Sequence, residues 1–158
     1  MKKIKKFDIL LMAIIIAVLV VLGLKFSALK ELGPGGQSVN YEAASVEFVI
    51  EGVRVMTTDA LHVGDTVYSN ETNNEIGKIK EVNIAPYVDN ITKVDGSIVP
   101  AEVPDKYTIT LVVETELSKR NTGYFAYGIT EIKTNSEAVL YTKYVKVIST
   151  VGGINFEQ

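Results

Sequence analysis

Cysteine is absent from the chain, and histidine occurs once among its 158 residues. Without cysteine there can be no disulfide, no thiolate nucleophile and no cysteine-ligated metal. A folded domain in this chain must therefore rely on its hydrophobic core, which a domain of about 120 residues can supply. The lack of disulfides favours a bacterial cell envelope over an animal secretory pathway.

The sequence also lacks the motifs of common enzyme classes: there is no Gly-x-Ser-x-Gly, and no glycine-rich phosphate loop follows a strand. The single histidine, His62, lies near Asp59 and Asp65, a candidate metal or proton-transfer site. Their spacing matches no strong metal motif, and aspartates here are typical of turns. We therefore expect no catalytic residue, metal site or cofactor, and a protein that is not an enzyme.

Positive charge is scarce after the N-terminal region. Beyond Lys25 there are 18 acidic and 11 basic residues, which gives this part a formal charge of −7. Nucleic acids and anionic lipid surfaces both require clustered lysine and arginine. The charge balance therefore argues against either as an electrostatic partner.

One long apolar run is present. Residues 9–24 are sixteen consecutive uncharged residues, twelve of them Ile, Leu or Val, worth about 4–7 kcal/mol on an insertion scale. Four lysines precede the run, so the positive-inside rule predicts a cytoplasmic N-terminus and an extracytoplasmic remainder. A cleaved signal peptide is the alternative, although Phe26-Ser-Ala is a poor cleavage site.

These features predict four segments: a cytoplasmic basic stub over 1–8, a transmembrane helix over 9–29, a flexible linker over 30–44 and a β domain over 45–158. The linker is predicted from Gly33-Pro-Gly-Gly, since glycine and proline oppose both helix and sheet.

The β prediction rests on alternation. Val46, Phe48 and Ile50 alternate with polar neighbours, and the parity changes at Gly52, which indicates a bulge or a sharp bend. Further strands are expected over 107–115, 124–132 and 138–147, and one capped helical turn over 57–61, with Thr57 or Thr58 as the cap. The expected fold class is all-β, a small barrel or sandwich of about 7–9 strands. The long connection over 89–106 is either a binding loop or an excursion hairpin.

The densest aromatic cluster is Gly123-Tyr-Phe-Ala-Tyr-Gly. Tyr124, Phe125 and Tyr127 are candidate partner-binding residues, for a sugar or a protein surface. Aromatic residues also favour strands because they pack well on a pleated surface. In a strand, Phe125 and Tyr127 would share one face and Tyr124 would lie on the other.

Two segments resemble each other weakly. Leu61–Tyr68 and Ile132–Tyr141 each contain an apolar residue, a turn and a strand that ends in tyrosine. Either the domain has two related halves, as in a pseudo-symmetric barrel, or the similarity of these turn–strand units is coincidental.

The chain resembles a bacterial family known only as domain of unknown function 4330. The resemblance covers most of the chain and rests on Glu51-Gly-Val-Arg, Ala60–Tyr68, Ile76-Gly-Lys-Ile and Gly123-Tyr with Tyr141-Thr-Lys-Tyr. It implies a short lysine-flanked anchor and one β-rich extracytoplasmic domain, and no activity. Asn135 stands where that family's pattern would favour glycine.

A more distant likeness is to the mammalian-cell-entry lipid-transport domain, also a small barrel behind one anchor. The order of Val63-Gly-Asp-Thr-Val and Ile76-Gly-Lys-Ile is similar to its opening. The polar segment 89–106 departs from that domain's apolar pore loop.

Taken together, the sequence predicts a single-pass cell-membrane protein with its C-terminal domain outside. Its expected role is non-enzymatic binding or assembly in the bacterial envelope, with the bilayer and an envelope protein or polymer as partners. Homo-oligomers are compatible with this role. The alternatives are a lipid-transport or export subunit of mammalian-cell-entry type and a hydrolase using paired carboxylates, whose pairing is spatial.

Overall fold

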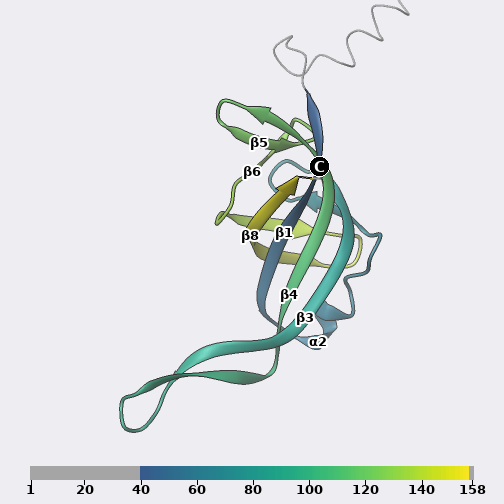
Figure 1. Ribbon diagram of the computed structural model, residues 1–158. Helices are drawn as coiled ribbons and strands as arrows, with labels where there is room; N and C mark the ends of the chain where they lie inside the picture. Colours follow the sequence, from purple (N-terminus) through teal and green to yellow (C-terminus); the bar gives the residue numbers. More distant parts are fainter. Residues whose placement is uncertain (1–39, 157–158) are drawn as a thin grey trace, which may run out of the picture. The chain divides into compact units, whose positions relative to one another are not determined.

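The computed structural model describes residues 40–156, which form eight strands and one short helix (Figure 1). All strand pairings are antiparallel and belong to one sheet. The all-β prediction is therefore confirmed for this part of the chain. The elements are β1 (Tyr41–Val53), α2 (Val55–Thr58), β2 (Thr66–Ser69), β3 (Glu75–Thr92), β4 (Ile98–Arg120), β5 (Gly123–Ala126), β6 (Thr130–Ile132), β7 (Glu137–Tyr141) and β8 (Lys146–Phe156).

The strand order in the sheet is β1-β8-β7-β2-β3-β4-β5-β6, and β1 also pairs with β4. Strand β1 thus has β8 on one side and β4 on the other. Each strand in the series β1, β8, β7, β2, β3, β4 pairs with the next, and β4 in turn pairs with β1. The β5–β6 hairpin extends the sheet from the last residues of β4.

The centre of the domain is the β1–β4 pair. Phe48 lies opposite Leu111, and Ile50 lies opposite Ile109. Alternate residues of both strands point into one core because side chains in a strand alternate between faces. Each such aliphatic or aromatic side chain contributes about 1.5–3 kcal/mol when fully buried. The largest fully buried side chains are Phe48, Ile50, Ile76, Ile79, Ile109, Leu111, Leu117, Leu140, Val46, Val67, Val113 and Val151.

The parity change at Gly52 is confirmed as a bulge. The β1–β4 register shifts between Ile50 and Val53, and Gly52 has a φ of 66°. Glycine adopts this left-handed conformation without the steric cost that a Cβ would bring.

The predicted helical turn is displaced toward the N-terminus. Helix α2 covers Val55–Thr58, its N-cap is Arg54, and no side chain caps it. The predicted cap at Thr57 or Thr58 is wrong, because Thr58 lies in the last helical position. Its hydroxyl instead donates to the Val55 carbonyl at 2.6 Å.

The first strand begins earlier than the sequence pattern indicates. Residues 41–44, at the end of the predicted linker, belong to β1, because Tyr41 and Ala44 pair with Ser118 and Thr115 of β4. The predicted stub and transmembrane segment, residues 1–29, lie outside the described residues, as does most of the linker.

The two later predicted strands are each divided by a turn. Residues 124–132 form β5 and β6, and residues 138–147 fall in β7 and β8. In the first case two consecutive residues, Tyr127 and Gly128, have positive φ values of 46° and 72°, and the backbone turns there between β5 and β6. In the second, the Thr142 amide donates to the Val145 carbonyl at 2.8 Å and closes a tight turn.

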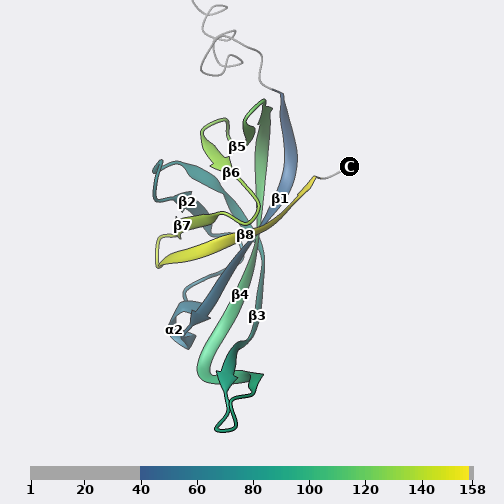
Figure 2. The same cartoon turned by 90° about the vertical axis from the view of Figure 1, so that its left-hand side faces the viewer.

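The segment over 89–106 is a hairpin excursion. Strands β3 and β4 continue as a pair beyond the core, and they project from the other strands of the domain (Figures 1 and 2). We call residues 86–107 the hairpin arm. At its base, Tyr87 packs beside Gly52 and under the Lys106 ammonium, 5.7 Å from the ring centroid.

Candidate functional site

The structure gives the three predicted aromatic residues different surroundings. Tyr124, in β5, packs against Phe156 with 5.2 Å between ring centroids. Phe125 lies under the Arg120 guanidinium, 4.4 Å from its ring centroid. Tyr127 lies beyond the strand, in the β5–β6 turn. The three residues are neighbours in sequence but do not form one flat surface.

Tyr127 is the most exposed of the three, at 37 %. Its amide donates to the Glu116 carbonyl at 2.9 Å, which fixes the turn. Partial burial, together with the nearby carboxylates of Glu75 and Glu116, raises the pKa of the Tyr127 hydroxyl above its ordinary value of 10.0. Of the predicted residues, Tyr127 is therefore the one whose side chain a partner can reach most readily.

The single histidine has a structural role in a turn. The His62 amide donates to Asp65 Oδ2 at 3.2 Å, and its ring edge faces Tyr144 at 6.0 Å. Asp59 instead accepts a hydrogen bond from the Thr58 hydroxyl at 3.4 Å. Within residues 40–156, no three His, Asp or Glu side chains are close enough to hold a metal ion.

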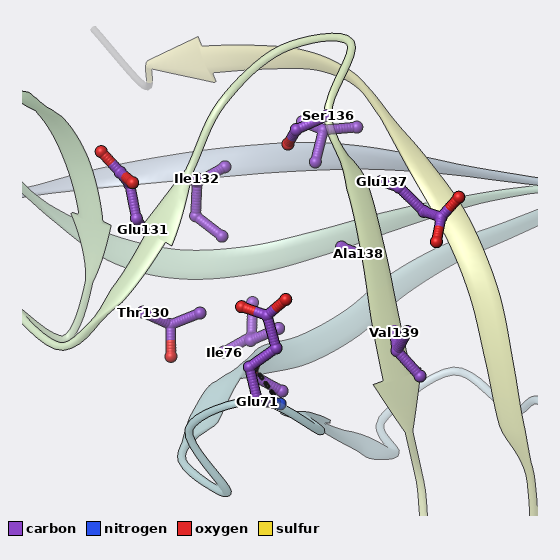
Figure 3. Close-up of a pocket in the computed structure, with 11 residues that line it drawn as sticks. Glu71, Ile76, Thr130, Glu131, Ile132, Ser136, Glu137, Ala138 and Val139 are labelled. Atoms are coloured by element: carbon purple, nitrogen blue, oxygen red, sulfur yellow. Dashed lines mark hydrogen bonds between the residues drawn. The ribbon is translucent and has the colours of Figure 1, made fainter.

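A small cavity lies between β6, β7 and the β2–β3 turn (Figure 3). Three glutamates from these segments line it: Glu71, Glu131 and Glu137. Its volume is about 40 Å³, enough for a few water molecules and too little for a sugar ring. The Glu131 carboxylate is already paired with Lys133 at 3.0 Å. Only a substantial opening of the cavity would let these carboxylates flank a glycosidic bond.

A wider groove of about 360 Å³ lies where the turn before β2 meets the end of β7. We call it the tyrosine groove, because two stacked tyrosines form part of its wall. Tyr68 of β2 pairs in register with Tyr141 of β7, with ring centroids 5.3 Å apart and planes inclined by 19°. The groove is lined by Gly64, Asp65, Thr66, Tyr68, Tyr141, Thr142 and Lys143.

Hydrogen bonds hold both walls of the tyrosine groove. On one wall, the Gly64 amide donates to the Ile79 carbonyl at 2.8 Å, and the Ile79 amide donates to the Asp65 carbonyl at 2.9 Å. On the other, the Thr142 hydroxyl accepts from the amides of Tyr144 and Val145 at 3.2 and 3.3 Å. The groove therefore exists before any ligand binds.

Sequence reasoning identified neither tyrosine as a site residue. The available signal was the weak similarity between Leu61–Tyr68 and Ile132–Tyr141, each ending in a tyrosine. The structure places the ends of these two segments side by side as a cross-strand pair.

The part of the chain that the structure describes includes no helix long and apolar enough to cross a membrane. The predicted spanning segment, residues 9–29, lies outside it.

Comparison with protein-family models gives one match, to the family described as "Domain of unknown function (DUF4330)", over residues 1–155. The chain belongs to this family. The match confirms the resemblance drawn from the turn and strand motifs, and it covers both the N-terminal region and the β domain. No curated protein and no solved structure matches this DUF4330 chain significantly.

Proposed function

We propose that this DUF4330 protein is a single-pass, membrane-anchored module of the bacterial cell envelope that binds or assembles partners without catalysing a reaction. The observation that carries the proposal is the hairpin arm, residues 86–107. The N-terminal residues 9–29 supply the anchor, and the domain after them lies outside the cytoplasm. The ring of strand pairings supports describing the domain as a small barrel.

The arm extends from the end of the domain opposite to the start of β1. Tyr41 pairs with Ser118, near the C-terminal end of β4, whereas the arm contains the N-terminal end of β4 at Ile98. At about 3.3 Å per residue, the β4 contour between Ser118 and Ile98 is about 65 Å. The arm tip therefore lies at the end of β4 that is distant from Tyr41, the first residue of β1.

The arm exposes aliphatic side chains. Val88, Ile91, Val94 and Ile98 are between 47 % and 110 % exposed. An isolated two-stranded hairpin is only marginally stable in water, so the arm gains little for its own folding from these residues. Val88 and Ile91 differ in parity and so lie on opposite faces of the arm, which therefore offers exposed aliphatic side chains on both faces to a partner protein.

On each outer edge of the arm, one outward-facing position cannot donate a hydrogen bond to an added strand. The Lys93 amide donates to the Ser97 carbonyl at 2.8 Å, so the alternation of an antiparallel ladder turns the backbone groups of Asn90 and Pro100 outward. Pro100 has no amide hydrogen to donate, and the Asn90 amide is taken up by the Asp89 carboxylate at 2.8 Å. Strand addition is therefore interrupted midway along each edge of the arm, whereas its side-chain faces remain open to a partner.

Membrane topology is the first test. A protease added outside cells whose outer layers are permeabilised should digest the β domain, and extraction of the full-length protein should require detergent. Protection of the domain until the inner membrane is opened, or release of the protein into buffer alone, would refute the anchored orientation.

The binding role is tested by photo-crosslinking in intact cells. A crosslinking amino acid at Val94, at the arm tip, should give discrete adducts with one or a few envelope proteins. The matched control is Ile129, which is 50 % exposed in the β5–β6 turn. Identical adducts from both positions, or none from Val94, would contradict a binding role for the arm.

A second candidate, a lipid-transport subunit of mammalian-cell-entry type, is favoured by the same exposed aliphatic residues. It predicts a hexamer-sized particle with bound lipid after detergent extraction. Light scattering with lipid analysis of the purified full-length protein distinguishes the two roles.

A further inference from the structure

The tyrosine groove lies on a row of side chains that crosses four strands. Tyr68 pairs with Glu75 of β3 on one side and with Tyr141 of β7 on the other, and Tyr141 pairs with Lys146 of β8. Because cross-strand partners share a face of the sheet, these four side chains lie on one surface. The stacked rings thus have a carboxylate at one end and an ammonium at the other.

Two more lysines border the same surface. Lys143 lines the tyrosine groove, and Lys78 is the cross-strand partner of Thr66. Within residues 40–156, no carboxylate lies within ion-pair distance of Lys78, Lys143 or Lys146. The acidic groups beside this surface are Glu75, Asp65 and Glu114. Asp65 accepts the His62 amide, and Glu114, the cross-strand partner of Lys78, is paired with Lys80 at 3.4 Å. Beside this groove the otherwise acidic domain therefore places three lysine ammoniums that form no ion pair with a described carboxylate, and that of Lys143 lies 5.5 Å from the centroid of the Tyr144 ring.

We propose that the tyrosine groove binds an acidic polysaccharide, with sugar rings against the Tyr68–Tyr141 stack and acidic substituents near the three lysines. Tyrosine suits this role because its ring is apolar while its hydroxyl remains a hydrogen-bond donor and acceptor. The groove volume of about 360 Å³ lies within the range of small-ligand sites. Polysaccharide binding at the tyrosine groove does not depend on the binding role proposed for the hairpin arm, so each proposal can be refuted while the other stands.

The strand pairing disfavours an extended peptide as the ligand. Peptides that bind sheets usually add a strand to a free edge. At the tyrosine groove β2 is paired with β3 and β7, and β7 is paired with β2 and β8, so both strands have neighbours on each side. A ligand must therefore be recognised through side chains, as a ring-bearing polymer would be.

The test uses purified full-length protein and an oligogalacturonate probe in a calorimetric titration. Tyr68→Ala and Tyr141→Ala should each weaken binding about tenfold, which corresponds to about 1.4 kcal/mol. Lys143→Gln and Lys146→Gln should each weaken it about two- to fivefold, the range expected of exposed charge pairs. Raising the ionic strength should weaken binding further.

Matched variants and probes decide the outcome. Tyr141→Phe, which retains the ring, should bind nearly as tightly as the wild type, and Lys119→Gln, in β4 away from the groove, should change nothing. Stronger binding of poly-glutamate than of oligogalacturonate would assign the groove to acidic peptides and overturn the proposal. No saturable binding of oligogalacturonate, or binding indifferent to loss of either tyrosine ring, would also overturn it.

Discussion

Gly77 is the position at which a single methyl group should damage the fold most. A Cβ built on Gly77 would overlap the backbone carbonyl oxygen of Glu114 in β4 and approach Val113 Cγ1 to 2.9 Å. Neither neighbour can move easily, because Val113 is buried in the core and the Glu114 backbone pairs with β3. Gly77→Ala therefore requires β3 and β4 to separate locally.

The cost can be estimated from what the separation breaks. Moving the strands apart by about 1 Å would weaken two or three ladder hydrogen bonds, each worth about 0.5–1.5 kcal/mol, and loosen the packing of Val113. We expect the free energy of unfolding of Gly77→Ala to fall by about 3 kcal/mol. For a domain of this size the midpoint should fall by about 10–15 °C.

The measurement is urea and thermal unfolding of the full-length protein, followed by far-UV circular dichroism. Gly153→Ala is the matched control: Gly153 also lies in a strand, and no atom lies within 4 Å of its Cβ position. It should be neutral or stabilise slightly. A loss below about 1 kcal/mol for Gly77→Ala, or equal losses for both variants, would refute the close approach of β3 and β4.

Further outcomes are expected from the same unfolding assay. Phe48→Ala, at a fully buried position, should cost about 3–5 kcal/mol because it leaves a cavity in the core; a cost below about 1 kcal/mol would contradict its central position. Thr115→Val should be neutral or stabilising, because the buried Thr115 hydroxyl has no hydrogen-bond partner within the described residues. Ser149→Ala should instead lower the free energy of unfolding by about 1 kcal/mol, because it removes the 2.9 Å hydrogen bond from the Ser149 hydroxyl to the Ala138 carbonyl. The raised pKa of Tyr127 means that the folded state favours the neutral hydroxyl. The free energy of unfolding should therefore not change with pH well below pH 10, the ordinary pKa of tyrosine. It should fall as the pH rises from 10 toward the higher pKa that Tyr127 has in the folded state. Tyr127→Phe should reduce that alkaline loss, and an unchanged pH profile would show that the hydroxyl is not perturbed.

Local alternation was sufficient to predict the core strands. Val46, Phe48 and Ile50 face inward as their spacing indicates, and so do Ile109 and Leu111. The reason is that side-chain direction in a strand depends only on sequence parity, once one face is buried. The bulge at Gly52 followed from the same rule, because a change of parity within a continuous strand requires an extra residue.

The aromatic candidate site could be predicted only as a cluster in sequence. Whether Tyr124, Phe125 and Tyr127 share a surface depends on where the strand ends, and the left-handed backbone at Tyr127 and Gly128 ends it after Ala126. That conformation is fixed by tertiary contacts, among them the Arg120 guanidinium, which donates to the Gly128 carbonyl at 2.6 Å. Parity rules carry no information about such a turn.

By itself, the sequence determined the fold class, the positions that face the core and membership of a family whose motifs lie in turns and strands. These are local properties, set by side-chain size, polarity and backbone preference. Only the tertiary structure decided that Tyr68 meets Tyr141, that three lysines border them and that residues 86–107 leave the core as an arm. Those relations depend on which strands pair and in what register, and strands far apart in the chain acquire a register only when the whole sheet forms.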